Sequence, residues 1–304
     1  MTGPVPSEWS SHRATWLGFP SHAALWEDDL AAAQQEVAAL ALALAGSGGE
    51  RVRLLVCGAR QAAERLLDGA AGVEIVDGTF GDVWLRDTAP IFLGPAQAAA
   101  FRFNGWGGKY VLAGDETVGE QVAADAGAAL ARHDFVLEGG ALDHDGEGTV
   151  LTTRQCLLNP NRNRGWTEAV AEQALREALG ARKVIWLGDG LLNDHTDGHV
   201  DNLARFVAPG VVAAPVAFGV DDPHARIYDD AAESLARAAD AAGRRLRIVR
   251  IPAPGRVRGD DGVWAPASHM NFIIANRAVL VPIYNERAGA LAIEALEAIF
   301  PDRR

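Results

Sequence analysis

Cysteine, basic charge and long apolar runs are all scarce in this chain of 304 residues, and each shortage excludes a class of protein. Two cysteines, Cys57 and Cys156, are too few for a disulfide scaffold and favour a reducing cytoplasm. The formal net charge of −12 argues against a nucleic-acid partner and fits a cationic ligand. No apolar run reaches the roughly 20 residues of a membrane span, and the N-terminus shows no signal pattern. We therefore expect a cytoplasmic protein.

The content of hydrophobic and charged residues indicates a globular protein. Hydrophobic residues make up 49% of the sequence and charged residues 22%, which is the composition of a soluble protein with an ample core. The length would allow two domains, but closed α/β architectures of this size often form one. We expect residues 1–304 to form a single domain.

Apolar periodicity divides the chain into alternating helices and strands. Helices are predicted at 28–45, 59–67, 115–132, 167–179, 229–242 and 288–300, strands at 51–57, 73–77, 135–138, 149–152, 183–187 and 246–252, and a hairpin at 268–283. The recurring unit indicates several similar α/β modules. Each earlier long helix precedes an apolar strand, but the last precedes only residues 301–304. Either a strand or more is missing after the last helix, or the chain simply ends on a helix, as many chains do.

One segment, residues 186–207, concentrates ionisable side chains between apolar runs. If residues 199–207 are extended, alternation places His199 and Asp201 on one face. A polar loop with solvated carboxylates is the alternative, but unpaired charges beside a core are costly. We interpret the segment as part of an active site. Its ionisable residues are Asp189, Asp194, His195, Asp197, His199 and Asp201.

Two further segments place polar groups next to aromatic residues and glycines. In residues 81–90, Asp87 is either a carboxylate at the mouth of a pocket or half of a local ion pair with Arg86 at a turn. Residues 101–110 combine glycines and aromatics, which allows backbone to approach a ligand closely. A hairpin at Asn104-Gly105 is an equally good reading, and no phosphate-loop pattern is present.

Residues 137–163 and 267–272 complete the set of polar segments. Glu138 ends a strand at a glycine pair, a geometry suited to pointing a carboxylate into a site. The asparagines at 159–163 indicate turns. Cys156 has no His or Lys beside it to lower the pKa of its thiol. His269 and Asn271 either line a cleft or make structural hydrogen bonds.

Together these segments resemble the agmatine deiminase family of the guanidine-modifying (pentein) superfamily, which also contains the bacterial peptidyl-arginine deiminases. The resemblance is carried, in family order, by WLRDTAP, FRFNGWGGKY, LEGGAL, LLNPNRN, DHTDGHVDNLARFVAPG and SHMNFIIAN. It implies an α/β propeller, a pseudo-five-fold ring of αββαβ modules around a central pocket, with the last module incomplete. It also implies hydrolysis of agmatine to N-carbamoylputrescine and ammonia, a step of putrescine biosynthesis.

The resemblance also assigns roles to individual residues. Asp87 and Asp201 hold the guanidinium, since carboxylates bind its forked donors in bidentate fashion and stabilise its charge during attack. His199 is the general acid and base. Glu138 orients His199. No metal or cofactor is implied. The pocket is lined by Trp106, Asp194, Asp197 and Asn271.

The sequence departs from the family at the nucleophile. The family's attacking cysteine ends a Gly-rich stretch in the dipeptide His-Cys near the C-terminus, and nothing after Pro301 supplies it, so that cysteine would lie beyond Arg304. Cys57 and Cys156 match other positions. We therefore expect little or no hydrolysis by these 304 residues, and a marginally stable or aggregation-prone protein.

Three alternatives stay open. A peptidyl-arginine deiminase would need to anchor a peptide, to which Arg102 would contribute. A non-catalytic guanidine-binding remnant would bind without turnover. In both of these cases the expected partner is a small guanidine or an arginine-containing molecule. The protein could also form a homo-oligomer. A metal hydrolase is the third, since N and O ligands are closely spaced at Asp194, His195, Asp197, His199 and Asp201.

Overall fold

The computed structural model describes residues 3–304, and its strands form five separate sheets that follow one another along the chain. The first sheet contains β1 (Thr15–Gly18), β2 (Val52–Val56) and β3 (Val73–Asp77). The second contains β4 (Ile91–Gly94), β5 (Gln97–Arg102) and β6 (Ala129–Val136), and the third β7 (Asp143–His144), β8 (Thr149–Thr153) and β9 (Lys183–Leu187). The fourth contains β10 (Arg205–Ala208), β11 (Val211–Val216) and β12 (Arg247–Pro252), and the fifth β13 (Ile273–Ile274) and β14 (Val279–Leu280).

The helices connect and cover these sheets. The longer ones are α2 (Leu30–Ala45), α3 (Arg60–Leu67), α6 (Val118–Asp125), α8 (Glu168–Leu179), α9 (Ala225–Arg237) and α10 (Glu286–Glu297). Short helical turns are α1 (Ala23–Trp26), η1 (Glu27–Asp29), α4 (Leu85–Thr88), α5 (Gly105–Gly108), η2 (Gly139–Ala141), α7 (Arg154–Leu157) and η3 (Val200–Asn202). No helix among residues 3–304 is long and apolar enough to cross a membrane.

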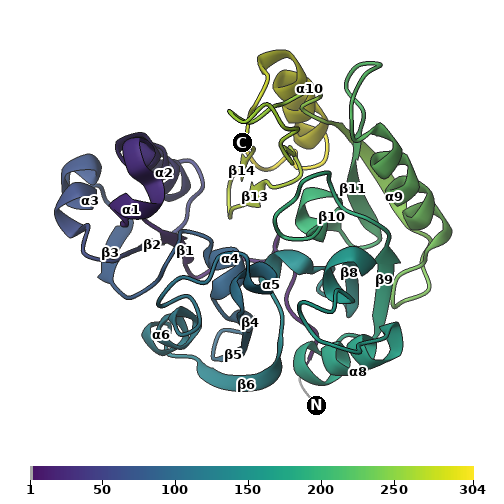
Figure 1. Cartoon of the computed structure of the whole chain (residues 1–304), viewed down its shortest axis with the longest axis horizontal. Helices are drawn as coiled ribbons and strands as arrows, with labels where there is room; N and C mark the ends of the chain where they lie inside the picture. The colour runs from purple at the N-terminus through teal and green to yellow at the C-terminus, as the bar shows by residue number, and fades with distance from the viewer. Residues whose placement is uncertain (1–2) are drawn as a thin grey trace.

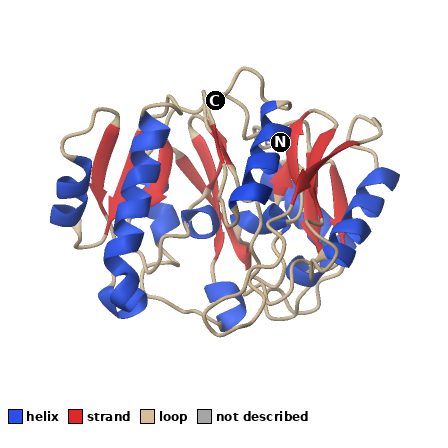
Figure 2. Ribbon diagram, turned by 90° about the horizontal axis from the view of Figure 1, so that it is seen from above, coloured by secondary structure: helices blue, strands red, loops and turns tan. Residues whose placement is uncertain are grey.

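The second, third and fourth sheets share one strand pattern. Their first two strands form an antiparallel hairpin, and the third strand lies parallel to the second. A parallel neighbour requires a crossover connection, which α6, α8 and α9 provide in turn. Figure 1 shows the sheets following chain order around the molecule, with α3, α6, α8 and α9 at its outer edge. The turned view of Figure 2 shows the helices lying outside the strands.

The apolar cores lie between neighbouring modules, and one cluster joins β8 and β9 of the third sheet to β10, β11 and α9. In α9, the buried side chains are Tyr228, Ala231, Ala232 and Leu235, which recur at helical spacing and so form one stripe facing β11 and β12. Full burial of such an aliphatic or aromatic side chain stabilises the fold by about 1.5–3 kcal/mol. The cores therefore fix the outer helices, and the strand ends and loops between the modules are left to carry polar groups.

Several predicted elements are wrong in their bounds, among them the strand predicted at 135–138, which is the end of β6. The helix predicted at 115–132 ends at Asp125, and β6 begins at Ala129. Gly127 adopts a φ of 69° there, which ends the helix although the surrounding run is rich in alanine. The helix predicted at 229–242 lies at 225–237. The sequence prediction also missed β1, β4, β5 and β11, whereas the strands predicted at 73–77 and 183–187 are confirmed.

Residues 199–207 are not one extended strand as predicted. The chain makes the short turn η3 at 200–202 and becomes a strand only at Arg205. Period-two alternation therefore does not place His199 and Asp201 together. The turn brings them together instead, as the geometry around Gly140 shows.

The last four residues, which the sequence interpretation treats only as a tail after the final helix, pair with the fifth sheet. The backbone N–H of Arg304 donates to the carbonyl oxygen of Arg277 at 2.9 Å, and its carbonyl oxygen accepts from the N–H of Val279 at 2.8 Å. Arg304 therefore lies along the start of β14, and its side chain is exposed. The strand expected beyond Arg304 stays a prediction.

Candidate active site

Four side chains that the sequence analysis predicts to be catalytic lie close together, at or beside short helical turns. Asp87 lies on α4, Glu138 precedes η2, and His199 and Asp201 flank the first residue of η3. Gly140 marks the point of convergence. A Cβ atom on Gly140 would lie 2.5 Å from His199 Nδ1 and 2.7 Å from both Asp201 Oδ2 and Asp87 Oδ1.

Asp87 is held rigidly by two donors. Its Oδ1 accepts a hydrogen bond from the backbone N–H of Gly140 at 2.8 Å, and its Oδ2 accepts one from Trp106 Nε1 at 2.9 Å. His199 Nδ1 lies 3.7 Å from Oδ1. The predicted local ion pair with Arg86 is wrong, because Arg86 turns away and binds Glu8. The carboxylate thus faces the site in a fixed orientation.

Asp201 is a buried carboxylate that lacks a full set of partners. Its Oδ1 has no hydrogen-bond partner among the described residues. Burial raises the pKa of Asp201 to about 6, while His199 lowers it and Asp87 raises it further. A buried carboxylate oxygen without a hydrogen-bond partner, next to a second carboxylate, is suited to bind a cation that carries N–H donors.

His199 is 2% exposed and lies between these carboxylates and Glu138. Burial opposes its charge, but Asp87, Cys156 and Asp201 outweigh burial and hold the pKa of His199 well above its ordinary value. Its Nε2 has no hydrogen-bond partner among residues 3–304. The imidazole is therefore a charged, incompletely bonded group, able to give a proton to a reacting molecule.

Comparisons with known proteins show the family of this chain. A model of the Porphyromonas-type peptidyl-arginine deiminase family matches residues 4–304. This chain belongs to that family. Among curated relatives, a putative agmatine deiminase of Pectobacterium atrosepticum is 35% identical over 98% of this chain and 87% of its own length. The agmatine deiminase of Pseudomonas aeruginosa strain LESB58 is 34% identical over 98% and 88%.

Solved structures of the family share the fold closely. Agmatine deiminase of Enterococcus faecalis superposes with a TM-score of 0.92 at 30% identity, covering 100% of this chain and 89% of its own. A cysteine-to-serine variant of the C. jejuni agmatine deiminase with substrate bound gives 0.88 at 27%, covering 99% and 89%. The DDAH of Pseudomonas aeruginosa, at 13% identity and a TM-score of 0.51, shares the fold alone over 93% of this chain and 89% of its own.

Arg162 is a site residue of this deiminase-family chain that the sequence interpretation missed. It is buried, and its Nε donates to Glu138 Oε1 at 2.6 Å while Nη1 donates to Asp197 Oδ2 at 2.5 Å. Asp197 also binds Lys109 Nζ at 2.6 Å and accepts from Asn161 Nδ2 at 2.9 Å. Asp197, predicted to line the pocket, is thus occupied in holding the cations around Glu138.

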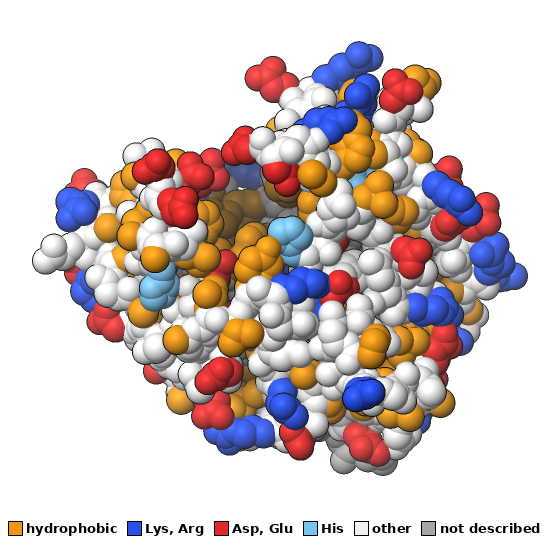
Figure 3. Space-filling view, in the orientation of Figure 1, with side chains coloured by type: hydrophobic (Ala, Val, Ile, Leu, Met, Phe, Trp, Pro, Cys, Tyr) orange, Lys and Arg blue, Asp and Glu red, His pale blue; other side chains and the backbone are white. Residues whose placement is uncertain are grey.

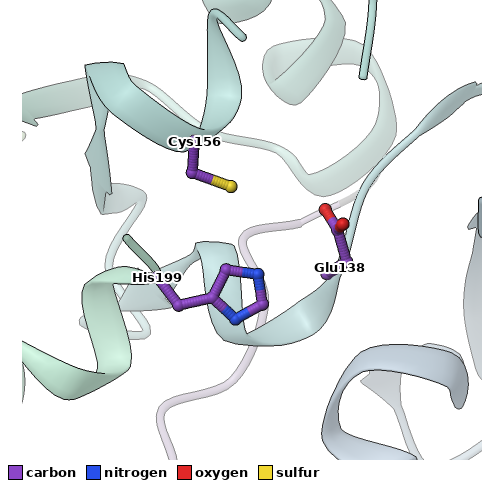
Figure 4. Close-up of side chains that lie close together, drawn as sticks. All are labelled: Glu138, Cys156 and His199. Carbon is purple, nitrogen blue, oxygen red and sulfur yellow. The ribbon is translucent and has the colours of Figure 1, made fainter. Parts of the chain in front are cut away.

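The carboxyl group of Glu138 is buried beside the imidazole. Burial raises the pKa of Glu138, although Arg162 and His199 act in the opposite direction. Figure 4 shows Glu138 and Cys156 approaching the same side of the His199 ring from two different segments. Glu138 and His199 therefore lie close together, and the orienting role that the resemblance implies for Glu138 stays a prediction.

Cys156 corrects one sequence interpretation. No His is near it in sequence, but His199 and Glu138 each place a ligand atom within 4.8 Å of its thiol. These three residues are the only such donor group found among residues 3–304, so the predicted metal set at 194–201 does not gather. The donor types suit zinc, but one of them, Glu138, is already bound by the guanidinium of Arg162.

Arg304, beyond which the resemblance places the attacking cysteine, contributes no side chain to the site. Its backbone is bonded to Arg277 and Val279 at the fifth sheet, and its side chain is exposed. Within the described chain, the thiol that lies beside His199 is that of Cys156. The position of the family's nucleophile therefore stays a prediction from the resemblance.

The remaining predicted pocket residues lie at its edge. Asp194 Oδ1 accepts from the backbone N–H and hydroxyl of Thr196, which forms the turn before His199. Asn271 donates to Asn202 Oδ1 at 3.1 Å. Arg102 is 66% exposed and lies 3.4 Å from Asp134. It lines a 380 Å³ cavity between the second sheet and α6, to which Asp87 and Gly139 also contribute.

A stacked pair covers the mouth of the site. Tyr110 and His195 stack with ring centroids 5.5 Å apart, and the tyrosine hydroxyl lies 2.6 Å from His195 Nδ1. Lys109 Nζ donates to the backbone carbonyl of His195. The segment 104–110 holds this position through a left-handed backbone, with Trp106 at φ 51°, rather than through the predicted hairpin. On the face seen in Figure 3 the surface is hollowed between the α2 and α10 sides, with hydrophobic walls.

Proposed function

We propose that this site binds the guanidinium of agmatine between Asp87 and Asp201 and serves a deiminase reaction that yields N-carbamoylputrescine and ammonia. The convergence of both carboxylates and His199 on Gly140 is the observation that carries the proposal. The relatives named agmatine deiminase support it. A guanidinium offers planar, forked donors, so two rigid carboxylates on either side hold its plane and stabilise charge as its central carbon becomes tetrahedral.

His199 supplies the proton steps of this proposal. Its raised pKa favours the imidazolium, which protonates the departing ammonia. The neutral imidazole left behind then accepts a proton from the water that releases the urea-type product. Glu138 stabilises the imidazolium from the other side, and Arg162 keeps Glu138 in place.

Neither cysteine of residues 1–304 acts as the nucleophile in this proposal. Cys156 is fully buried in the core cluster with Leu157 and Leu175, and burial raises the pKa of its thiol. Cys57 packs against a different core, beside β2. The resemblance assigns the attacking thiol to a Gly-rich His-Cys segment beyond Arg304. We therefore propose that neither Cys57 nor Cys156 attacks the guanidinium carbon.

Agmatine is favoured over a peptidyl arginine by the position of Arg102. A peptide substrate needs an anchor for its carbonyl or carboxylate groups near the pocket mouth. Arg102 is instead paired with Asp134, and both side chains are largely exposed. An acidic pocket edge containing Asp194 suits the distal ammonium of agmatine better.

Isothermal titration calorimetry and an ammonia assay test the proposal together. We expect agmatine to bind, a blocked arginine peptide to bind at least about tenfold more weakly, and putrescine, which lacks the guanidinium, not to bind measurably. Ammonia release should be the same for the wild-type chain and Cys156→Ala. Tighter binding of the peptide would favour the peptidyl-arginine alternative. Turnover that disappears in Cys156→Ala would make Cys156 the nucleophile.

We further propose that the five sheets form a pseudo-five-fold ring around the site and that residues 1–304 form one domain. The repeated hairpin-plus-parallel register supports this arrangement. The two unpaired thiols support a cytoplasmic location. Small-angle scattering that fits separate, independently moving halves would contradict the ring. Analytical ultracentrifugation would decide between a monomer and a homo-oligomer.

A further inference from the structure

An ion cluster lies behind the two guanidinium-binding carboxylates, and the proposed reaction does not use it. Glu8 Oε2 accepts from Arg86 Nη2 at 2.7 Å and lies 2.5 Å from Arg205 Nη2. The other oxygen, Oε1, accepts from the backbone N–H of Ile274 at 3.1 Å. One carboxylate therefore joins three segments that are far apart in the sequence: α4, β10 and β13.

Arg205 anchors this cluster in the protein interior. Its side chain is 1% exposed, and its Nε donates to Asp143 Oδ2 at 2.6 Å. Its Nη1 donates to the carbonyl oxygens of Met270 and Phe272 at 3.2 and 3.0 Å. Because all these donors are used, Arg205 cannot shift without leaving buried groups unpaired.

The cluster is connected to the site through the backbone. Arg86 precedes Asp87 in the same turn, and Arg205 follows Asp201 by four residues at the start of β10. The two guanidinium groups repel each other, and Glu8 lies between them. Burial disfavours the charge of Glu8, but Arg205 and Arg86 outweigh it and hold the pKa of Glu8 well below its ordinary value. The bridging charge is thus present at every pH of interest.

We propose that Glu8 is a positioning residue that sets the distance between Asp87 and Asp201, so that both contact one guanidinium. The inference rests on the proposed function for its ligand and on the ion cluster for its geometry. A displacement of about 1 Å in a positioning group can lower the rate of a reaction by about two orders of magnitude. Without the shared anion, α4 and β10 lose their common contact, and the two carboxylates lose their fixed spacing.

The test compares Glu8→Gln with Glu50→Gln. Glutamine keeps the size of Glu8 and an acceptor for Ile274, but not the charge. Glu50 is a matched control, because it is a buried acid that lies 3.0 Å from His12 Nδ1 and accepts from the backbone of Asn276, away from α4 and η3. Both variants should lower the Tm. Only Glu8→Gln should weaken agmatine binding, by at least about tenfold at a temperature where both variants are folded.

A second readout needs no ligand. The indole N–H of Trp106 donates to Asp87 Oδ2 at 2.9 Å, so its proton-nitrogen NMR signal reports the position of Asp87. The signal is identified by its loss in Trp106→Phe. We expect it to shift in Glu8→Gln, to return towards its original position in Glu8→Asp, and to stay unchanged in Glu50→Gln.

The outcomes separate the two proposals. A normal agmatine Kd and an unmoved Trp106 signal in Glu8→Gln would overturn the positioning role, whatever the loss of stability. If the wild-type chain binds no agmatine, the proposed function fails, and the Trp106 signal alone then decides whether Glu8 positions Asp87.

Discussion

At the scale of single residues, Asp201 shows a conflict between stability and binding. Its carboxylate is 6% exposed, and one oxygen has no partner among the described residues. A pKa near 6, against an ordinary value of 3.8, means that the charged carboxylate destabilises the fold by about 3 kcal/mol at neutral pH, relative to the same group in the unfolded chain. A bound guanidinium would remove that cost by supplying both a charge and hydrogen-bond donors.

The Asp201→Asn variant should therefore bind more weakly and fold more stably. We expect agmatine affinity to fall by about 10- to 100-fold, since a hydrogen bond to a charged group contributes about 1.5–3 kcal/mol. We expect the free energy of unfolding without ligand to rise by about 1–2 kcal/mol, because the buried charge is gone. Calorimetric titration and urea unfolding measure the two effects. A joint loss of affinity and stability would instead make Asp201 a structural residue.

The same residue predicts how binding depends on pH. The groups that face Asp201 are His199, Asp87, Arg86 and Arg205. Because the folded pKa of Asp201 is raised, it takes up a proton as the pH falls through about 6, and its attraction for a cation is then lost. His199 stays charged over this range because its pKa is also raised. Agmatine affinity should fall between pH 7 and pH 5, and titrations of Asp201→Asn should show a flatter profile.

At the scale of elements, η2 places a glycine where three functional groups meet. Gly140→Ala should push its new methyl group against His199, Asp201 and Asp87, all at less than 3 Å. Such overpacking costs about 1–3 kcal/mol of stability, and the displaced groups should abolish measurable agmatine binding. Gly188→Ala is the control, because nothing lies within 4 Å of a Cβ there. Equal behaviour of the two variants would refute the crowding argument.

The elements also show what a sequence can predict. Helices α2, α3 and α8 and strands β3 and β9 were predicted within a few residues, because their apolar residues repeat with a clear period. The turn η3 was not predicted. His199, Val200 and Asp201 alternate as in a strand, and only the tertiary contacts of the site favour a tight turn. The helix predicted at 115–132 was too long, because the alanines in this segment favour a helix but Gly127 ends it.

The site was predicted unevenly for a physical reason. Asp87, Glu138, His199 and Asp201 belong to segments that resemble the family, and they do converge here. Arg162 stands among asparagines that indicate turns, and its partner Glu138 is 24 residues away. Cys156 and His199 are 43 positions apart in the sequence, so no local pattern could report their contact. A buried ion pair between distant segments can be recognised only when the three-dimensional positions of both segments are known.

At the scale of the whole molecule, the N-terminal segment 3–12 links several modules. Val5 belongs to the core under α8, and Trp9 packs against the cores that contain Leu235 and Leu296. His12 pairs with Glu50 beside the first sheet. This segment therefore contacts the first, third, fourth and fifth parts of the fold, which should make them unfold together.

Removing residues 3–10 should break that cooperativity. The loss of Val5 and of the Glu8 ion pair should cost more than about 5 kcal/mol of unfolding free energy. For the full chain, urea transitions followed by circular dichroism and by tryptophan fluorescence should coincide. In the shortened chain they should separate or disappear. An unchanged urea midpoint after the deletion would show that the segment does not stabilise the fold.

The separation of outer helices from central turns bears on how such a protein can diversify. The outer helices are fixed by apolar clusters on their inner faces, so their solvent faces can accumulate substitutions without reaching Gly140. Under the proposed function, the segments that carry the stacked pair of Tyr110 and His195 would contact the part of the ligand beyond its guanidinium. Laboratory evolution towards longer or bulkier guanidines should therefore draw its successful mutations from the cover segments, and leave the carboxylate pair untouched.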